Sequence, residues 1–206
     1  MLRPMRDNVC PLTARCEHSA HNSYVVRSIS LVLAALLLLL TACSAGSPQP
    51  NAGGNAAPLD AATTRAILDY ELIDVRSGGR FTLRQLASDK PVLVETMAVW
   101  CVTCLGQQRE VVRAHALADF HSVGLDVDPN ERAADLVTYS EREGFDWPYA
   151  MADAGLVKLL TDAYGFGVTN PPSTPTFVIT QDGKIRALEF GRVRSAEELV
   201  TELGAG

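Results

Sequence analysis

Long apolar runs, basic residues and histidines are all scarce in this chain of 206 residues. The longest apolar run, "ISLVLAALLLLL" (residues 29–40), has twelve residues, whereas a membrane-spanning helix needs about 20. Its length is instead typical of the apolar part of a secretory signal. After Cys43, 14 Lys and Arg oppose 22 Asp and Glu, which gives a formal charge of −8. Because no basic patch stands out, we expect no nucleic-acid partner.

A cysteine follows directly behind the apolar run. The stretch "LTAC" (residues 40–43) resembles the lipobox of bacterial lipoproteins, in which the cysteine receives a diacylglyceryl group and becomes the new N-terminus after cleavage. The resemblance implies a signal peptide over residues 1–42 and lipidation, including palmitate, at Cys43. We therefore expect the mature protein on the extracytoplasmic face of the cell membrane. An ordinary signal peptide with a chance cysteine is the alternative.

The composition changes again beyond the lipobox. Residues 43–64 are rich in Ala, Gly, Ser, Pro and Asn and contain almost no large apolar side chain. Such a segment cannot bury enough surface to offset its ordering entropy, so we expect a flexible tether. From residue 65 onward apolar and charged residues alternate. Residues 65–206 are numerous enough for one domain with its own core, and no internal repeat indicates a second domain.

Hydrophobic periodicity in this domain alternates between the patterns of strands and helices. Strands are expected at residues 70–75, 81–83, 91–99, 121–129, 176–180 and 185–190. Helices are expected at 102–117, at 130–143 with Asn130 as N-cap and Gly144 as stop, at 156–165, and at 196–203 with Ser195 as N-cap. The order predicts an α/β fold, in which the first two strands form a hairpin around the "RSGGR" turn.

Two cysteines stand three residues apart in "VWCVTC" (residues 99–104), where an apolar strand gives way to a helix. The carboxyl end of a buried strand is the usual position of a site in α/β sheets. Cys101 and Cys104 would share one helix face, so their sulfurs can reach disulfide geometry without backbone movement. The N-terminus of the helix would favour a thiolate at Cys101, which makes it the expected nucleophile. Cys104 would then be the resolving thiol.

Two other uses of this cysteine pair are weaker. A zinc site needs two further ligands, and the domain offers only His115 and His121, neither of them in a second cysteine-rich motif. A purely structural disulfide around a two-residue loop would remove little entropy from the unfolded chain. Redox chemistry is therefore the favoured interpretation, with no metal bound.

Three motifs together resemble the thioredoxin-like superfamily, in particular its membrane-tethered TlpA/redoxin branch. "WCVTC" matches the W-C-x-x-C active site, and "STPTFVI" (residues 173–179) matches the loop whose proline is cis and faces that site. "LDVDPNE" (residues 125–131), followed by a helix, matches the redoxin segment between the halves of the fold. The resemblance covers residues 70–203. It implies a central mixed sheet flanked by helices, with the predicted hairpin as an N-terminal β-hairpin extension.

The resemblance also implies roles for three residues near the cysteines. Trp100 would be a flat apolar flank beside the nucleophile, with a packing role as the alternative. Pro175 would be the cis proline. Thr174 would present its backbone to a substrate peptide beside Cys101.

Glu95 lies six residues before Cys101, inside an otherwise apolar strand. A carboxylate is costly to bury in ionised form, so we expect a raised pKa for this side chain. Thioredoxins carry an aspartate at the matching position, which helps to move a proton for the resolving cysteine. Glutamate is one methylene longer, so its reach differs from that of the family. An edge position facing solvent is the alternative.

The resemblance implies a lipid-anchored thiol–disulfide oxidoreductase, monomeric and without a bound cofactor, whose partners are protein thiols or disulfides and a membrane electron carrier. The TlpA branch favours the reducing direction, in cytochrome c maturation or thiol reduction. One alternative is a non-catalytic metal- or haem-handling module, although the histidine that Sco-type copper chaperones use far downstream has no counterpart after His121. A thiol peroxidase is another, although Ala98 stands where peroxiredoxins have a threonine.

Overall fold

A computed structural model describes residues 59–204, and the structural statements below concern that part of the chain. The predicted signal peptide (1–42), the lipidation site Cys43 and tether residues 43–58 lie outside it, so those predictions remain predictions. Among residues 59–204, no helix combines the length and the apolar character that crossing a membrane requires.

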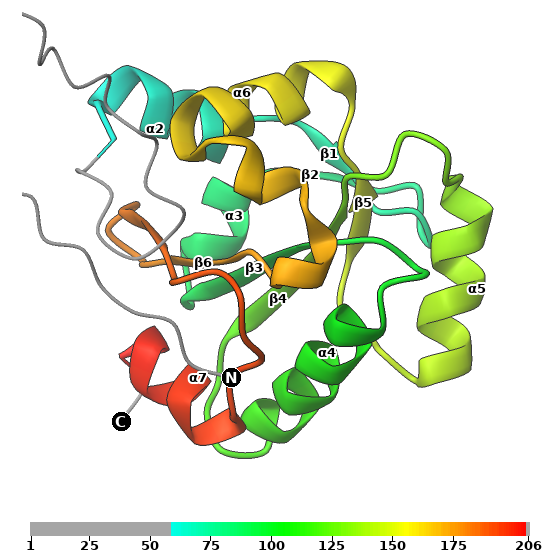
Figure 1. Cartoon of the computed structure of the whole chain (residues 1–206). Helices are drawn as coiled ribbons and strands as arrows, with labels where there is room; N and C mark the ends of the chain where they lie inside the picture. Colours follow the sequence, from blue (N-terminus) through cyan, green and yellow to red (C-terminus); the bar gives the residue numbers. More distant parts are fainter. Residues whose placement is uncertain (1–58, 205–206) are drawn as a thin grey trace, which may run out of the picture. The chain divides into compact units, whose positions relative to one another are not determined.

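A five-stranded mixed sheet forms the centre of the domain, in the order β5-β4-β3-β6-β7 (Figure 1). Its strands are β3 (Val92–Met97), β4 (His121–Asp126), β5 (Tyr149–Met151), β6 (Thr176–Ile179) and β7 (Ile185–Ala187). β3, β4 and β5 run parallel, whereas β6 is antiparallel to both β3 and β7. β3 is fully buried and lies in the middle, which confirms the buried strand expected before the cysteines. β5 was not predicted, because three residues are too few to show a period.

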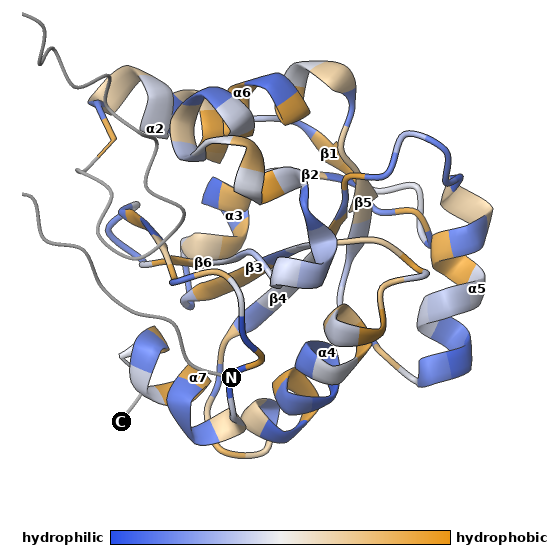
Figure 2. Cartoon of the chain, in the orientation of Figure 1, coloured by the Kyte–Doolittle hydropathy of each residue, from blue (hydrophilic) through white to orange (hydrophobic). Residues whose placement is uncertain are grey.

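Helices cover both faces of the sheet (Figure 1). The helices are α2 (Ala61–Leu68), α3 (Leu83–Ala87), α4 (Val102–His115), α5 (Ala133–Glu143), α6 (Ala154–Tyr164) and α7 (Ala196–Leu203). Side chains alternate along β3, so Leu93 and Met97 join one core with α4, α5 and α7, while Val92 and Val94 join the other with α2, α3 and α6. Figure 2 shows apolar and polar residues alternating along the helices, as expected for helices buried on one side.

The first two strands form the predicted N-terminal hairpin, β1 (Leu72–Ile73) and β2 (Arg80–Phe81), in a separate antiparallel sheet. The N–H of Val75 donates to the carbonyl of Tyr149 at 2.9 Å, which joins the hairpin to β5. The strand predicted over 81–83 was wrong at its end, because Thr82 and Gln85 form a capping box that starts α3 at Leu83. The α/β class, the mixed sheet flanked by helices and the hairpin extension are all confirmed.

Two helix starts differ from the predictions. Asp60 caps α2 by accepting the N–H groups of Ala62 and Thr63, so residues 61–64 are helical, although the tether was predicted to extend to 64. α5 begins after Arg132 and not at Asn130, whose N–H and side chain donate to Asp128 in the preceding turn. Local side-chain caps decided both boundaries. The stop at Gly144, which is left-handed, and the cap at Ser195 are confirmed.

Candidate active site

Cys101 and Cys104 are joined by a disulfide at the start of α4, with 5.2 Å between their Cα atoms. Cys101 is the N-cap of the helix, and its Sγ accepts the N–H of Cys104 at 3.1 Å. Both residues are buried, although the intervening Val102 is 81% exposed. The chain therefore places a two-cysteine pair at the carboxyl end of β3, with one sulfur on the N–H groups of a helix N-terminus.

The turn η2 (Pro171–Ser173) lies directly against this pair. The carbonyl oxygen of Pro171 is 3.2 Å from the Sγ of Cys104. The hydroxyl of Thr103 lies 3.3 Å from the Sγ of Cys101 and donates to the carbonyl of Pro172 at 3.1 Å. A thiol at Cys104 would thus find an acceptor in the Pro171 carbonyl.

The cis proline predicted at Pro175 is wrong, because no peptide bond among residues 59–204 is cis. Thr174 adopts the left-handed conformation (φ 46°, ψ 58°), and its N–H donates to the carbonyl of Pro171 at 2.8 Å. This turn reverses the chain with a trans peptide. The carbonyl of Pro175 then accepts the N–H of Thr96 at 3.0 Å and extends the pairing of β6 with β3. Pro171 contacts Cys104 through its carbonyl, and Pro172 contacts Thr103, which lies between the two cysteines in the sequence.

The substrate-facing role predicted for Thr174 is also wrong in this structure. The residue is only 1% exposed. Pro171 occupies its N–H, and its carbonyl accepts the hydroxyl of Thr176 at 3.0 Å. Its own hydroxyl donates to the carbonyl of Arg192 at 2.7 Å. The N–H of Thr174 is therefore already engaged inside the protein, and its carbonyl already accepts one hydrogen bond.

Trp100 lies on the surface beside the cysteine pair. Its side chain is 55% exposed, and its indole N–H donates to the carboxylate of Asp128 at 2.6 Å. A packing role in the core therefore does not describe this residue. Together with Val102 it gives the protein an exposed apolar flank around Cys101.

Glu95 is buried, at 4% exposure, and the alternative of a solvent-facing edge position is wrong. Alternation along β3 places it on the same face as Leu93 and Met97, the face that α4 covers. Neither of its carboxyl oxygens has a hydrogen-bond partner among the described residues. Burial alone raises the pKa of Glu95 well above its usual value, because the ionised carboxylate loses its hydration.

A small polar cluster surrounds Glu95 below α4. Glu95, Gln108 and Ser122 line a cavity of about 10 Å³. The side-chain oxygen of Gln108 accepts the hydroxyls of Tyr139 at 3.3 Å and Tyr149 at 2.5 Å. Gln108 follows Cys104 by one turn of α4, so this cluster lies on the helix that carries the cysteines.

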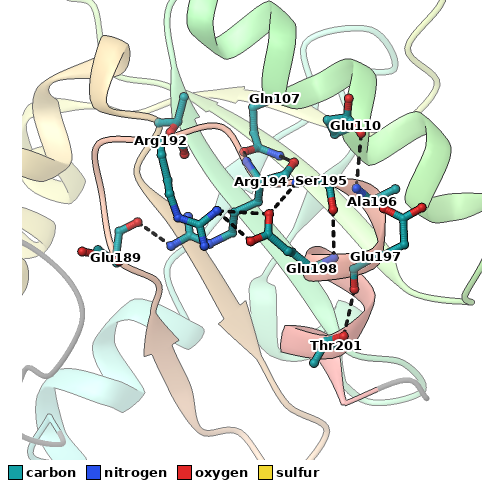
Figure 3. A network of polar contacts seen from close by, with 11 residues as sticks. Gln107, Glu110, Glu189, Arg192, Arg194, Ser195, Ala196, Glu197, Glu198 and Thr201 are labelled. Carbon is teal, nitrogen blue, oxygen red and sulfur yellow. Dashed lines mark hydrogen bonds and ion pairs between the residues drawn. The ribbon is translucent and has the colours of Figure 1, made fainter.

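Sequence reasoning missed the glutamines on α4. Gln107, which is fully buried, donates to the carbonyl of Arg194 at 3.2 Å and accepts its N–H at 2.7 Å (Figure 3). One turn later Glu110 accepts the N–H of Ala196 at 3.2 Å (Figure 3). These contacts join α4 to the start of α7. The two adjacent glutamines were visible in the sequence. Only the structure shows that the backbone of Arg194 lies against Gln107, which makes Gln107 a buried contact between helices and not part of a solvent-exposed face.

Both histidines contact other side chains of the domain. His115 stacks on Phe120 with 4.0 Å between ring centroids and lies 2.9 Å from the hydroxyl of Ser122. His121 lies 3.0 Å from the carboxylate of Asp89. Within residues 59–204, no three His, Cys, Asp or Glu side chains come together in an arrangement suited to a metal ion.

No protein-family model and no curated protein sequence matches the chain. Solved structures do match. A thiol:disulfide interchange protein of the thioredoxin family from Chlorobium tepidum TLS is 22% identical, covers 73% of this chain and 97% of its own, and has a TM-score of 0.57. A secreted disulfide oxidoreductase of Mycobacterium tuberculosis is 14% identical, covers 66% of this chain and 96% of its own, and has a TM-score of 0.52. A SCO1/SenC family lipoprotein from Bacillus anthracis str. Ames is 16% identical, covers 66% of this chain and 90% of its own, and has a TM-score of 0.50. At these identities the likeness establishes the fold.

Proposed function

We propose that this chain, which has the thioredoxin-like fold, is a thiol–disulfide oxidoreductase acting on proteins outside the cytoplasm. The observation that carries the proposal is the Cys101–Cys104 disulfide at the N-terminus of α4. In the reduced protein, the N–H that now contacts the Sγ of Cys101 would stabilise a thiolate there. The solved structures with this fold include proteins named as disulfide oxidoreductases, which supports the same reaction class.

The proposed reaction reduces a protein disulfide in two exchanges. The Cys101 thiolate attacks one substrate sulfur, forms a mixed disulfide and releases the first substrate thiolate. The Cys104 thiol then loses its proton and attacks the Sγ of Cys101. The mixed disulfide breaks, the second substrate thiol leaves, and the protein keeps the Cys101–Cys104 disulfide. Two protein thiols are oxidised and one substrate disulfide is reduced.

The residues around the pair would assist these two steps. Trp100 and Val102 give a substrate peptide an apolar surface beside Cys101. Glu95, under the same helix, is proposed to exchange the proton that Cys104 must lose.

We further propose that the protein works as a reductase, anchored through a lipid on Cys43. A membrane electron carrier would return the disulfide to two thiols, and cytochrome c maturation or general thiol reduction would be the use. The lipobox-like "LTAC" and the resemblance to the TlpA branch support this assignment.

The reaction is tested by insulin reduction and by the reduction potential measured against glutathione. Two-cysteine oxidoreductases span roughly −270 to −120 mV, and a potential near the lower limit supports a reductase. Stoichiometric metal without insulin reduction would favour a metal-handling module instead. Peroxide consumption that depends on Cys101 would favour a peroxidase.

The anchor is tested by Cys43→Ala in the source organism or a related bacterium. Stable anchoring requires two or more acyl chains, so the variant is expected to leave the membrane fraction. A variant that remains bound to the membrane after signal cleavage would contradict the lipid anchor.

A further inference from the structure

The loop that follows β4 holds the two residues that precede Cys101. Glu131 accepts the N–H of Val99 through both carboxyl oxygens, at 3.0 and 2.9 Å. Asp128 accepts the indole N–H of Trp100 at 2.6 Å. One carboxylate therefore fixes the main chain and the other fixes the side chain, immediately before the proposed nucleophile.

Val99 needs an acceptor from outside the sheet. β3 ends at Met97 and α4 begins at Val102, so Val99 lies in the turn between them. The N–H of Cys101 is taken by the carbonyl of Ala98 at 3.1 Å, within the same turn. The glutamate thus supplies a long-range contact to the main chain of this turn.

The loop itself is fixed at its base. The N–H of Val127 donates to the carbonyl of Met97 at 3.1 Å, which joins the loop to the end of β3. Asp126, only 1% exposed, accepts the N–H of Asp128 at 2.8 Å through one carboxyl oxygen. Burial first, and then the neighbouring carboxyl of Glu131, raise the pKa of Asp126. A proton on Asp126 lowers the negative charge at the base of this loop.

We propose that Glu131 is a positioning residue for thiol chemistry at Cys101. It holds the peptide of Val99 in place, so that Cys101 meets the N–H groups of α4 in the orientation that stabilises a thiolate. The inference rests on the proposed function for its reaction, but it predicts the reactivity of a thiol and needs no protein substrate to be tested.

The test compares three substitutions of Glu131 in the full chain carrying Cys104→Ala. Glu131→Gln keeps the length and an oxygen acceptor but removes the charge. Glu131→Asp keeps the charge but withdraws the carboxylate by one methylene. Glu131→Ala removes both. Glu141→Ala, an exposed glutamate on α5, is the matched control.

Two readouts follow these variants after reduction. The first is the rate of Cys101 alkylation by iodoacetamide as a function of pH, measured by mass spectrometry of the peptide that carries it. The second is acrylamide quenching of tryptophan fluorescence, which reports mainly on Trp100, because Trp147 is only 7% exposed. Circular dichroism verifies folding.

Glu131→Ala is expected to lower the alkylation rate at neutral pH by roughly ten-fold, since small misplacements of a reacting group cost at least that much, and to increase quenching. Glu131→Asp should show part of both changes, whereas Glu131→Gln and Glu141→Ala should match the parent. If Glu131→Ala does not fold, Glu131→Asp decides: reactivity equal to that of the parent overturns the proposal. A lower alkylation rate in Glu131→Gln with a parental rate in Glu131→Asp also overturns the proposal. The charge of the side chain, and not its length, would then matter. Absence of insulin reduction by the unmodified protein would defeat the proposed function while leaving this test intact.

Discussion

The two faces of the central sheet bury different kinds of side chain. The face under α2, α3 and α6 is almost entirely apolar, with Thr96 as a polar exception whose hydroxyl donates to the carbonyl of Val168 at 2.7 Å. The face under α4, α5 and α7 buries Glu95, Gln107 and Gln108 together with the cysteine pair. One face is therefore packed almost entirely with apolar side chains, while the other adds buried polar groups to its apolar core near the cysteine pair.

Substituting the cysteines is expected to have the largest effect on activity. Cys101→Ala is expected to abolish insulin reduction completely, because no nucleophile remains. Cys104→Ala should retain the attack and accumulate mixed disulfides, which non-reducing electrophoresis detects. Free energies of unfolding should be compared for the reduced proteins, where both variants are expected to lie close to the parent. Adducts that persist equally in Cys101→Ala would contradict the assigned roles.

The apolar face is tested by Leu160→Ala on α6. Leu160 is buried in that core, and truncating a buried leucine costs about 2 to 5 kcal/mol of unfolding free energy. Urea denaturation measures the loss, and alkylation of Cys101 in the folded protein should be unchanged. Lys158→Ala, on the exposed side of the same helix, is the control and should cost no more than about 1 kcal/mol. If Leu160→Ala also changed the alkylation rate of Cys101 in the folded protein, the two faces would not act independently.

The clamp between α4 and α7 is tested by Gln107→Ala. The substitution leaves the N–H and the carbonyl of Arg194 without their partners inside the protein, at a cost of about 1 to 3 kcal/mol. Arg109→Ala, an exposed neighbour on the same helix, should have a much smaller effect on urea unfolding. Equal stabilities of the two variants would show that the clamp contributes little.

The buried carboxyl is tested by Glu95→Gln as a function of pH. A raised folded-state pKa means that the folded protein holds this proton more tightly than the unfolded chain, whose value is near 4.3. The resulting contribution to stability is fully present below about 4.3 and is lost as the pH rises through the folded-state pKa. The variant should therefore gain stability relative to the parent with rising pH, by at most about 1.4 kcal/mol per pH unit.

The same variant should resolve mixed disulfides more slowly, because the proposed proton carrier for Cys104 is gone. Stopped-flow measurement of this step across pH 5 to 8, alongside chemical denaturation, provides both readouts. Stability and rates that both match those of the parent would mean that Glu95 carries no proton in this reaction.

Sequence patterns were sufficient for several features that depend on a few neighbouring residues. The apolar run around Glu95 predicted a buried strand and hence a buried carboxyl, and the three-residue spacing of Cys101 and Cys104 predicted their disulfide geometry. The helix caps at Ser195 and Gly144 were also predicted correctly. Each of these features depends on a few neighbouring residues.

The failures around the cysteine pair depended on more distant parts of the chain. The hydroxyl of the buried Thr174 donates to the carbonyl of Arg192, on the far side of the β6–β7 hairpin. Gln107 became part of a clamp only because the backbone of residue 194 reaches it. No local pattern reports these contacts, because the partners are 18 residues apart for Thr174 and Arg192 and 87 residues apart for Gln107 and Arg194.

Thr174 also has a consequence for the tolerance of the chain to substitution. Among residues 59–204 it is the non-glycine residue with a positive φ, at 46°, a region where branched side chains are strongly disfavoured. Asparagine and glycine adopt this conformation readily, whereas valine lacks both the freedom and the hydroxyl that binds Arg192. Natural variation or directed evolution should therefore pass through Asn or Gly at this codon and avoid Val and Ile. The turn against the cysteine pair thus tolerates few residue types at position 174.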